Sequence, residues 1–252
     1  VDHLPNLPAL ERVYVSRLSA ARGDPRVSRL EDVIGKPNDW AKLSDLPLPD
    51  VDASLREIAH IFDDLKLDGV CLLTSVDERY IGHPDFWPVY EELNRREAVV
   101  FIHPCYPPGT EARGWDIPRM LIDYPFETTR VATNLIFNGV MEKLPKIKFI
   151  LSHAGGTLPM LAHRISIFDK KTKQQDNYPQ GALAYIRRFY FDSALCGHKV
   201  PLDALRGFAP ASQILFGSDY PYVNAQIALE ETAGFDAYQG FSAEERHMAE
   251  RG

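Results

Sequence analysis

The sequence is poor in cysteine and has no long apolar run. Three cysteines, Cys71, Cys105 and Cys196, are spread over 252 residues without a CxxC pair. This spacing argues against a disulfide scaffold and favours a reducing compartment, so we expect a cytoplasmic protein. No apolar segment approaches the roughly 18 to 20 residues that a membrane-spanning helix needs, so no membrane association is predicted.

Basic clusters and glycine-rich phosphate loops are also missing. The 28 Lys and Arg residues are outnumbered by 35 Asp and Glu residues, and the formal net charge is −7. A nucleic-acid-binding protein is therefore not expected. No glycine-rich nucleotide turn follows an early strand, so we expect no organic cofactor. No repeat, linker or change of composition divides the chain, which predicts a single domain over residues 1–252.

The positive signal is an alternation of short apolar runs with longer segments of helical period. Such runs are typical of parallel strands that are buried on both faces. The predicted strands cover residues 12–16, 41–46, 69–74, 98–102, 148–152, 189–192 and 213–217. Three helices stand out between them: one over 52–66, one capped by Asp85 and one over 128–144. A long loop is expected over 105–125.

Repeated strand–helix units leave two solutions, an open doubly wound sheet or a closed barrel. The open sheet ordinarily carries a nucleotide-binding turn, which this sequence lacks. The length of 252 residues also matches the roughly 250 residues of an eight-fold barrel. We therefore predict an α/β protein of the (β/α)₈ TIM barrel type.

Three ionisable residues come directly after apolar strands: His103, His153 and Asp219. In a barrel these positions converge on the C-terminal rim, where active sites of this architecture lie. Imidazole and carboxylate ligands suit a divalent ion such as zinc. Three ligands would only just complete a catalytic metal site and would leave no residue for proton transfer. The residues thus predict a functional site of which part is missing.

Other candidates carry weaker signals. His163 fits a subunit interface or an ordinary helix face, and Trp115 and Tyr222 fit either an aromatic pocket near the rim or burial against the barrel. The three cysteines fit small core residues. The remaining histidines are expected to be solvated; they are His60, His83, His198 and His247.

The segments VVFIHP, FILSHAGG, FYFDSAL and QILFGSDYPY resemble the amidohydrolase superfamily. The similarity runs from about residue 46 to 222 and is closest to the branch of metal-dependent non-oxidative decarboxylases typified by aminocarboxymuconate-semialdehyde decarboxylase. It implies a barrel of the metal-dependent hydrolase type with one divalent ion, usually zinc and in some members manganese. The implied ligands are an HxH pair on strand 1, His103 after strand 5 and Asp219 after strand 8.

The resemblance also implies roles for two further residues. His153 matches the histidine that assists substrate protonation near the metal. Arg164 matches the last residue of an HxGGxxPxxxxR segment, whose arginine binds a substrate carboxylate in the neighbouring subunit's active site. A homodimer is therefore expected.

The sequence departs from the family pattern because it contains no HxH. Only seven strands are predicted, and if residues 12–16 form strand 2, the missing strand is the first. We expect that strand and its two ligands to lie outside the 252 residues, and we expect the final helix to be cut short.

The expected function is the decarboxylation of a small aromatic or unsaturated carboxylic acid of the salicylate, resorcylate or muconate type. In this reaction Asp219 and His153 supply a proton to the carbon that loses carbon dioxide. Two alternatives remain open. A metal-dependent hydrolase, either a lactonase or an amidohydrolase, would use Asp219 to deprotonate a metal-bound water. A metal-free barrel with a binding role is the third possibility. Product analysis separates the first two, and metal content separates both from the third.

Overall fold

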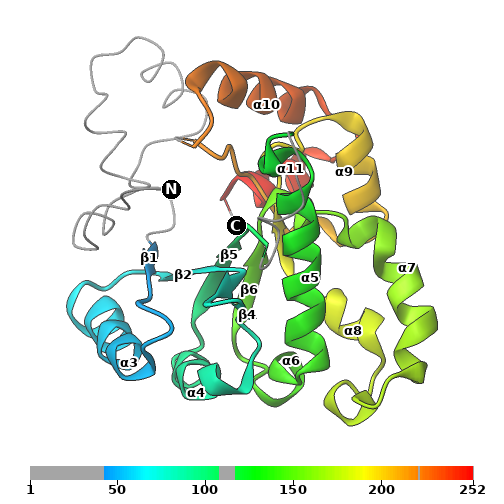
Figure 1. The fold of residues 1–252 in the computed structure, drawn as a ribbon. Helices are drawn as coiled ribbons and strands as arrows, with labels where there is room; N and C mark the ends of the chain where they lie inside the picture. Colours follow the sequence, from blue (N-terminus) through cyan, green and yellow to red (C-terminus); the bar gives the residue numbers. More distant parts are fainter. Residues whose placement is uncertain (1–42, 108–116, 221, 252) are drawn as a thin grey trace.

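The computed structural model describes residues 43–107, 117–220 and 222–251. Its centre is a sheet of six parallel strands (Figure 1). The strands are β1 (Leu43–Asp45), β2 (Gly69–Leu73), β5 (Val99–His103), β6 (Lys148–Leu151), β7 (Tyr190–Asp192) and β8 (Ile214–Leu215). Six of the seven predicted strands are thus confirmed. The seventh, over 12–16, lies outside the described residues.

The strand order identifies the type of sheet. Along the sheet the strands follow one another in chain order, β1-β2-β5-β6-β7-β8, and every neighbouring pair is parallel. A doubly wound sheet reverses its strand order at the ligand-binding crevice, whereas a βα-barrel does not. The order therefore supports the barrel rather than the open sheet. Within the described residues, β1 and β8 form the two ends of the sheet.

Helices follow the strands and pack along the outside of the sheet (Figure 1). They are α3 (Val51–Ala59), α4 (Trp87–Arg95), α5 (Asp123–Phe137), α6 (Val140–Lys143), α7 (Leu158–Phe168), α8 (Ala182–Ile186), α9 (Lys199–Arg206), α10 (Ala225–Ala237) and α11 (Ala243–Arg251). A short hairpin of β3 (Ser75–Val76) and β4 (Arg79–Tyr80) follows β2. Within the described residues, no helix is both long and apolar enough to cross a membrane.

The core lies between the strands and the inner faces of these helices. Val100 and Ile102 of β5 are fully buried, as is Leu151 of β6. Val131 and Leu135 of α5 are also fully buried, because residues four apart lie on the same face of a helix. This packing fixes the strand ends from which the candidate site residues project.

Local geometry corrects three predicted helix boundaries. The first helix narrows to α3 and continues as a π-helix over His60–Asp64, which leaves Leu65 exposed instead of in the apolar stripe. Asp85 lies inside a short 3₁₀ helix over Pro84–Phe86 instead of capping the second helix.

The third predicted helix is in fact two. Gly139 takes the left-handed conformation, with φ of 81°, and separates α5 from α6. Helix α5 begins at Asp123 and a 3₁₀ turn covers Arg119–Leu121, so the loop expected over 105–125 is partly helical. Pro125 misled the prediction, since proline is well tolerated in the first turn of a helix.

Candidate metal and catalytic site

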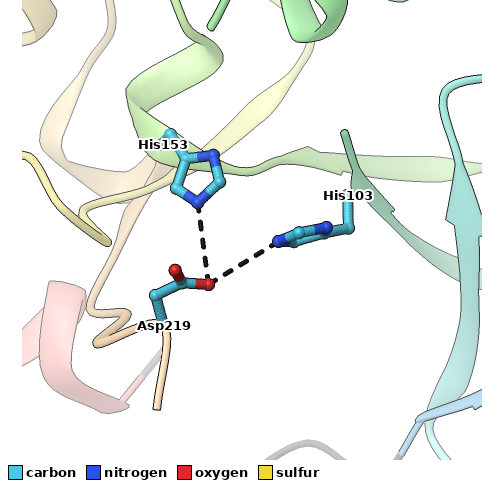
Figure 2. A group of neighbouring side chains, drawn as sticks. All are labelled: His103, His153 and Asp219. Atoms are coloured by element: carbon cyan, nitrogen blue, oxygen red, sulfur yellow. Dashed lines mark ion pairs between the residues drawn. The ribbon is translucent and has the colours of Figure 1, made fainter. Parts of the chain in front are cut away.

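Three side chains from three strand ends meet at one point. His103 ends β5, His153 follows β6 and Asp219 follows β8. The Nε2 atoms of His103 and His153 lie 3.6 Å and 3.7 Å from Oδ1 of Asp219 (Figure 2). One ligand atom from each residue lies within 4.8 Å of the others, a spacing that could hold a metal ion. The convergence predicted from the strand ends is therefore observed.

The site leaves two buried nitrogen atoms without a partner. Nε2 of His103 and Nε2 of His153 are both buried, and neither makes a hydrogen bond with any residue that the structure describes. Buried polar atoms nearly always make a hydrogen bond, so two buried nitrogen atoms without one require an explanation. Both nitrogen atoms point toward Oδ1 of Asp219 (Figure 2). A divalent ion bound by nitrogen and oxygen ligands fits this donor set.

The His103 ring is held in the form that binds a metal. Its Nδ1 lies 2.9 Å from the carbonyl oxygen of Pro104. Because a carbonyl only accepts, Nδ1 must carry the proton and donate. In a neutral ring this leaves Nε2 with a free lone pair directed at Asp219. A backbone carbonyl that fixes the tautomer in this way is usual for metal-binding histidines.

Electrostatics separates the roles of Asp219 and His153. Burial alone would raise the pKa of Asp219, but the two facing imidazoles outweigh it and lower the pKa to about 2. Burial alone would lower the pKa of His153, but the carboxylates of Asp219 and Asp192 outweigh it and raise the pKa above its ordinary value. Asp219 is therefore ionised, and His153 retains a proton more readily than a free histidine.

The site residues stand on strained backbone. His153, Ala154 and Asp219 have φ angles of 55°, 56° and 57°, in the left-handed region that residues with a side chain rarely adopt. Each such residue costs of order 1 kcal/mol, and such strain tends to gather at functional sites. The turn continues through Gly156, where a Cβ would lie 2.0 Å from the carbonyl oxygen of Pro125 in α5. Only glycine permits this close contact between the turn and the helix.

Aromatic rings border the site on the side of His103. The ring of Tyr222 stacks on His103 with centroids 5.5 Å apart, and Tyr124 meets His103 edge-on at 6.2 Å. Tyr106 lies next to Tyr124, with ring centroids 5.7 Å apart. Tyr222 is 56% exposed, so its position at the rim is confirmed and its burial against the barrel is not. Trp115, the other predicted ring, lies outside the described residues.

Tyr124 and Tyr106 were missed by sequence reasoning. Both belong to the segment that was expected to be a loop, and Tyr124 in fact lies in the first turn of α5. Burial, with a smaller contribution from Tyr106, raises the pKa of Tyr124 to about 12. The phenol is therefore neutral near pH 7. The available signal applied to Tyr106, which comes three residues after the strand that ends at His103.

Arg164 does not join this cluster. It lies exposed on α7, with its guanidinium 5.3 Å above the ring of Phe168. It borders a different cavity, of about 770 Å³, between α5 and α7. His103, His153 and Asp219 are not among the residues that line this cavity. Within one chain, Arg164 is thus separate from the candidate metal site.

The other histidines behave as expected for surface residues. His60 pairs with Asp64 at 2.9 Å and is partly exposed. His83 and His198 approach carboxylates at 3.4 Å and 3.8 Å, and His163 and His247 are exposed.

The cysteines are free and only partly buried. The Sγ atom of Cys105 lies 3.2 Å and 3.3 Å from the hydroxyls of Thr74 and Ser75. Cys105 therefore has polar surroundings, in contrast to the small core role predicted for it.

Comparison with known proteins assigns a family. The family model described as amidohydrolase matches residues 15–252. A 6-methylsalicylic acid decarboxylase of Penicillium expansum is 38% identical over 208 residues, which cover 81% of this chain and 64% of that protein. A 2-amino-3-carboxymuconate-6-semialdehyde decarboxylase of Dictyostelium discoideum is 28% identical over 188 residues, or 74% of this chain and 52% of that protein. The chain thus spans about half to two thirds of the length of these relatives.

Solved structures have the same fold. The crystal structure of an amidohydrolase II superposes with a TM-score of 0.76 at 26% identity, covering 92% of this chain and 74% of that chain. A dihydroxybenzoic acid decarboxylase from Polaromonas, with bound manganese and the inhibitor 2-nitroresorcinol, gives a TM-score of 0.73 at 23% identity, covering 97% of this chain and 76% of that chain. The predicted barrel is therefore the fold of this chain.

Proposed function

This chain belongs to the amidohydrolase family, and on that premise we propose that it is a metal-dependent, non-oxidative decarboxylase of a small aromatic or unsaturated carboxylic acid. The observation that carries the proposal is the pair of buried Nε2 atoms of His103 and His153, which face Asp219 and make no hydrogen bond with the described residues. The relatives named as decarboxylases of aromatic and muconate-type acids support the same reaction.

We propose that His103 and Asp219 hold one divalent ion. The free lone pair of His103 and the ionised carboxylate are suitable ligands for zinc, which we favour, and for manganese. When bound, the ion supplies a Lewis acid that orients the substrate carboxylate and withdraws electron density from it. The proposal requires no organic cofactor.

In this proposal His153 is the proton donor. Its pKa is raised above that of an ordinary histidine, and the adjacent carboxylate of Asp219 stabilises the protonated form of the ring. His153 delivers that proton to the ring carbon that bears the substrate carboxylate. The new C–H bond forms as the C–C bond breaks, the electron pair of that bond returns to the ring, and neutral carbon dioxide leaves. Asp219 then favours reprotonation of His153 from solvent.

The aromatic residues suit a planar substrate. Tyr124 and Tyr222 approach His103 from different directions, and their rings can border a flat molecule beside the metal ligands. The neutral phenol of Tyr124 can donate a hydrogen bond to an anionic oxygen of the substrate. A salicylate, resorcylate or muconate-type acid meets these requirements.

A substrate panel tests the proposal. The full chain, loaded with zinc or manganese in separate samples, is incubated with salicylates, resorcylates and muconate-type acids, and with lactones and amides as hydrolase substrates. We expect carbon dioxide and the matching decarboxylated product from at least one acid. Hydrolysis of lactones or amides without decarboxylation of any acid would contradict the proposal and favour the hydrolase. The His103→Ala variant, which lacks a proposed metal ligand, is the negative control.

We further propose a homodimer in which Arg164 reaches the partner's active site and binds the substrate carboxylate. The position of Arg164 outside its own chain's cluster supports this role, and guanidinium binds carboxylates well. On the same helix, Met160 is 76% exposed, and Ile167 and Phe168 are also exposed, which is the apolar character typical of a subunit interface.

Mixed dimers test the crossing of Arg164. Arg164→Ala and His103→Ala chains are inactive in separate dimers if each supplies half of every site. In a mixed dimer, one of the two sites then has both residues intact, so activity should return to about half of the parent's value per heterodimer. No recovery in demonstrated heterodimers would contradict the crossing. Arg95→Ala, which removes an exposed arginine on α4, serves as the control.

A further inference from the structure

The end of β7 contacts both of the turns that present the candidate site. Oδ1 of Asp192, the last residue of β7, accepts the backbone N–H of His153 at 2.7 Å and the N–H of Ala194 at 3.1 Å. The next residue, Ser193, accepts the N–H of Gly217 at 3.2 Å through its hydroxyl oxygen. Gly217 lies two residues before Asp219 on the segment that follows β8. One dipeptide therefore holds the chain on both sides of the site.

The carboxylate of Asp192 meets a specific need of the backbone at His153. Residue 153 leaves the sheet with φ of 55°, so its buried N–H cannot continue the ladder of β6. An unpaired buried N–H costs about 1–3 kcal/mol, in addition to the strain of the left-handed conformation. Asp192 is only 7% exposed and supplies an anionic acceptor, which makes the stronger kind of hydrogen bond. It can therefore hold the turn in a conformation that the turn does not favour by itself.

The same side chain is packed against the segment that carries Asp219. A Cβ atom at Gly217 would lie 3.1 Å from Cβ, Cγ and Oδ2 of Asp192, which is closer than ordinary van der Waals contact. Glycine at this position lets the chain after β8 lie directly on the carboxylate. A change in the position of Asp192 should therefore shift both His153 and Asp219.

We propose that Asp192 is a positioning residue that sets the His153 imidazole opposite Asp219, through the backbone of one and the packing of the other. It touches neither ligand nor substrate in this account. The inference rests on the proposed function only for its effect on turnover. Its effect on the geometry of the two imidazoles is independent of any reaction.

Two substitutions of Asp192 distinguish a role in positioning His153 from a role in the stability of the fold alone. Asp192→Asn keeps an oxygen that can accept both N–H groups, whereas Asp192→Ala removes it. The matched control is Asp169→Ala. Asp169 is also a buried carboxylate that accepts a backbone N–H, from Ala182 at 2.9 Å, but it lies at the junction of α7 and α8, away from the site.

The first readout is the imidazole nitrogen and carbon NMR signals of His103 and His153 in metal-free protein. We expect the His153 signals to move farther in Asp192→Ala than in Asp192→Asn, which keeps the acceptor oxygen and loses only the charge that raises the pKa of His153. They should remain at the parent's positions in Asp169→Ala. Unchanged His153 signals in a folded Asp192→Ala protein would overturn the proposal. So would Asp169→Ala moving them as far as Asp192→Ala does.

The second readout is the affinity for zinc or manganese by calorimetric titration. Asp192 packs against the segment that carries Asp219, a metal ligand in the proposed function, and residues that orient ligands typically affect affinity 10- to 100-fold. We therefore expect a loss of that size in Asp192→Ala and a change below about threefold in Asp192→Asn. A metal affinity of the Asp192→Ala protein equal to that of the parent would contradict the proposal. If Asp192→Ala does not fold, Asp192→Ser, whose hydroxyl cannot span both N–H groups, takes its place with the same criteria.

The outcomes also separate this inference from the proposed function. A parent protein that binds metal but decarboxylates nothing would contradict the proposed function while the NMR and affinity series still decide the role of Asp192. A parent that binds no metal would leave that decision to the NMR series.

Discussion

Two carboxylates of this molecule reach the same pKa in opposite ways. Glu92 on α4 and Asp219 at the strand ends both have a pKa lowered to about 2. Glu92 accepts two hydrogen bonds from Arg95 at 2.7 Å each and one from Arg96 at 2.6 Å. Its charge is fully matched by guanidinium groups, and it has no further demand for a cation.

Among the described residues, Asp219 pairs with no guanidinium group, and its ion pairs are with the imidazoles of His103 and His153. The two imidazole nitrogens that face it are 3.6 Å and 3.7 Å away, which is too far for a good hydrogen bond, and those nitrogens are themselves partnerless. A lowered pKa alone therefore does not mark a functional carboxylate. The distinguishing feature of Asp219 is that the nitrogen atoms facing it, Nε2 of His103 and Nε2 of His153, make no hydrogen bond with the described residues. The predictions below test this difference.

The largest effect is expected at Asp219. Asp219→Asn removes the charge that would bind the ion and stabilise protonated His153, so turnover should fall by more than about 10⁴-fold, beyond the loss of a single acid–base group. The matched change Glu92→Gln should alter turnover by less than about threefold. Steady-state kinetics on the best substrate of the panel measures both. Comparable losses in the two variants would show that the distinction between the carboxylates is wrong.

His153→Ala should have the next largest effect. Loss of one positioned proton donor typically reduces turnover by about 10²- to 10⁴-fold, while the ion held by His103 and Asp219 should remain. Metal content by elemental analysis and turnover are measured on the same preparation.

His60→Ala, which removes an exposed ring paired with Asp64, is the control. Loss of the metal together with activity in His153→Ala would make His153 a ligand and not the proton donor.

The aromatic rings beside His103 should make a smaller contribution, and it should be to substrate binding. Tyr124→Ala removes the ring beside His103 and should weaken substrate binding by roughly tenfold, the value of about 1.4 kcal/mol that ring contacts can supply. Tyr124→Phe keeps the ring and should lose less. Substrate dissociation constants by fluorescence or calorimetry measure the series. A greater loss in Tyr124→Phe than in Tyr124→Ala would assign the main role to the hydroxyl.

The smallest effect concerns stability. Because folding lowers the pKa of Glu92 from 4.5 to about 2, its ionised form stabilises the fold above pH 4.5, and this contribution is lost as the pH falls toward 2. Glu92→Gln should therefore be less stable than the parent by about 1 kcal/mol at pH 7, a value discounted for partial exposure. The difference should shrink between pH 4.5 and 2. Urea unfolding across that range measures it, and a constant difference would be inconsistent with the linkage.

The sequence was most informative where short-range patterns decide the structure. Apolar runs located the six described strands, and the residue directly after a buried strand located His103 and His153. Parallel strands bring their carboxyl ends to one edge, so the meeting with Asp219 followed from the pattern. The helix break at Gly139 depended on one left-handed residue that hydrophobic periodicity does not report.

The residues that escaped prediction owe their place to tertiary contacts. Asp192 resembles any acidic residue at a strand end until its carboxylate is seen to accept the N–H of His153. Tyr124 was assigned to a loop, because Pro125 obscured the start of α5. The separation of Arg164 from its own chain's site likewise depends on the tertiary arrangement that places it at a cavity between α5 and α7, which no local pattern determines.

The central claim is that His103 and Asp219 hold one divalent ion beside His153. Calorimetric titration of zinc or manganese into metal-free parent and His103→Ala protein tests it most directly. The account predicts about one ion per parent chain, and an affinity at least 100-fold lower in folded His103→Ala protein, because losing a direct ligand should exceed the usual 10- to 100-fold effect of an outer residue. Equal affinity and stoichiometry in the two proteins would contradict it.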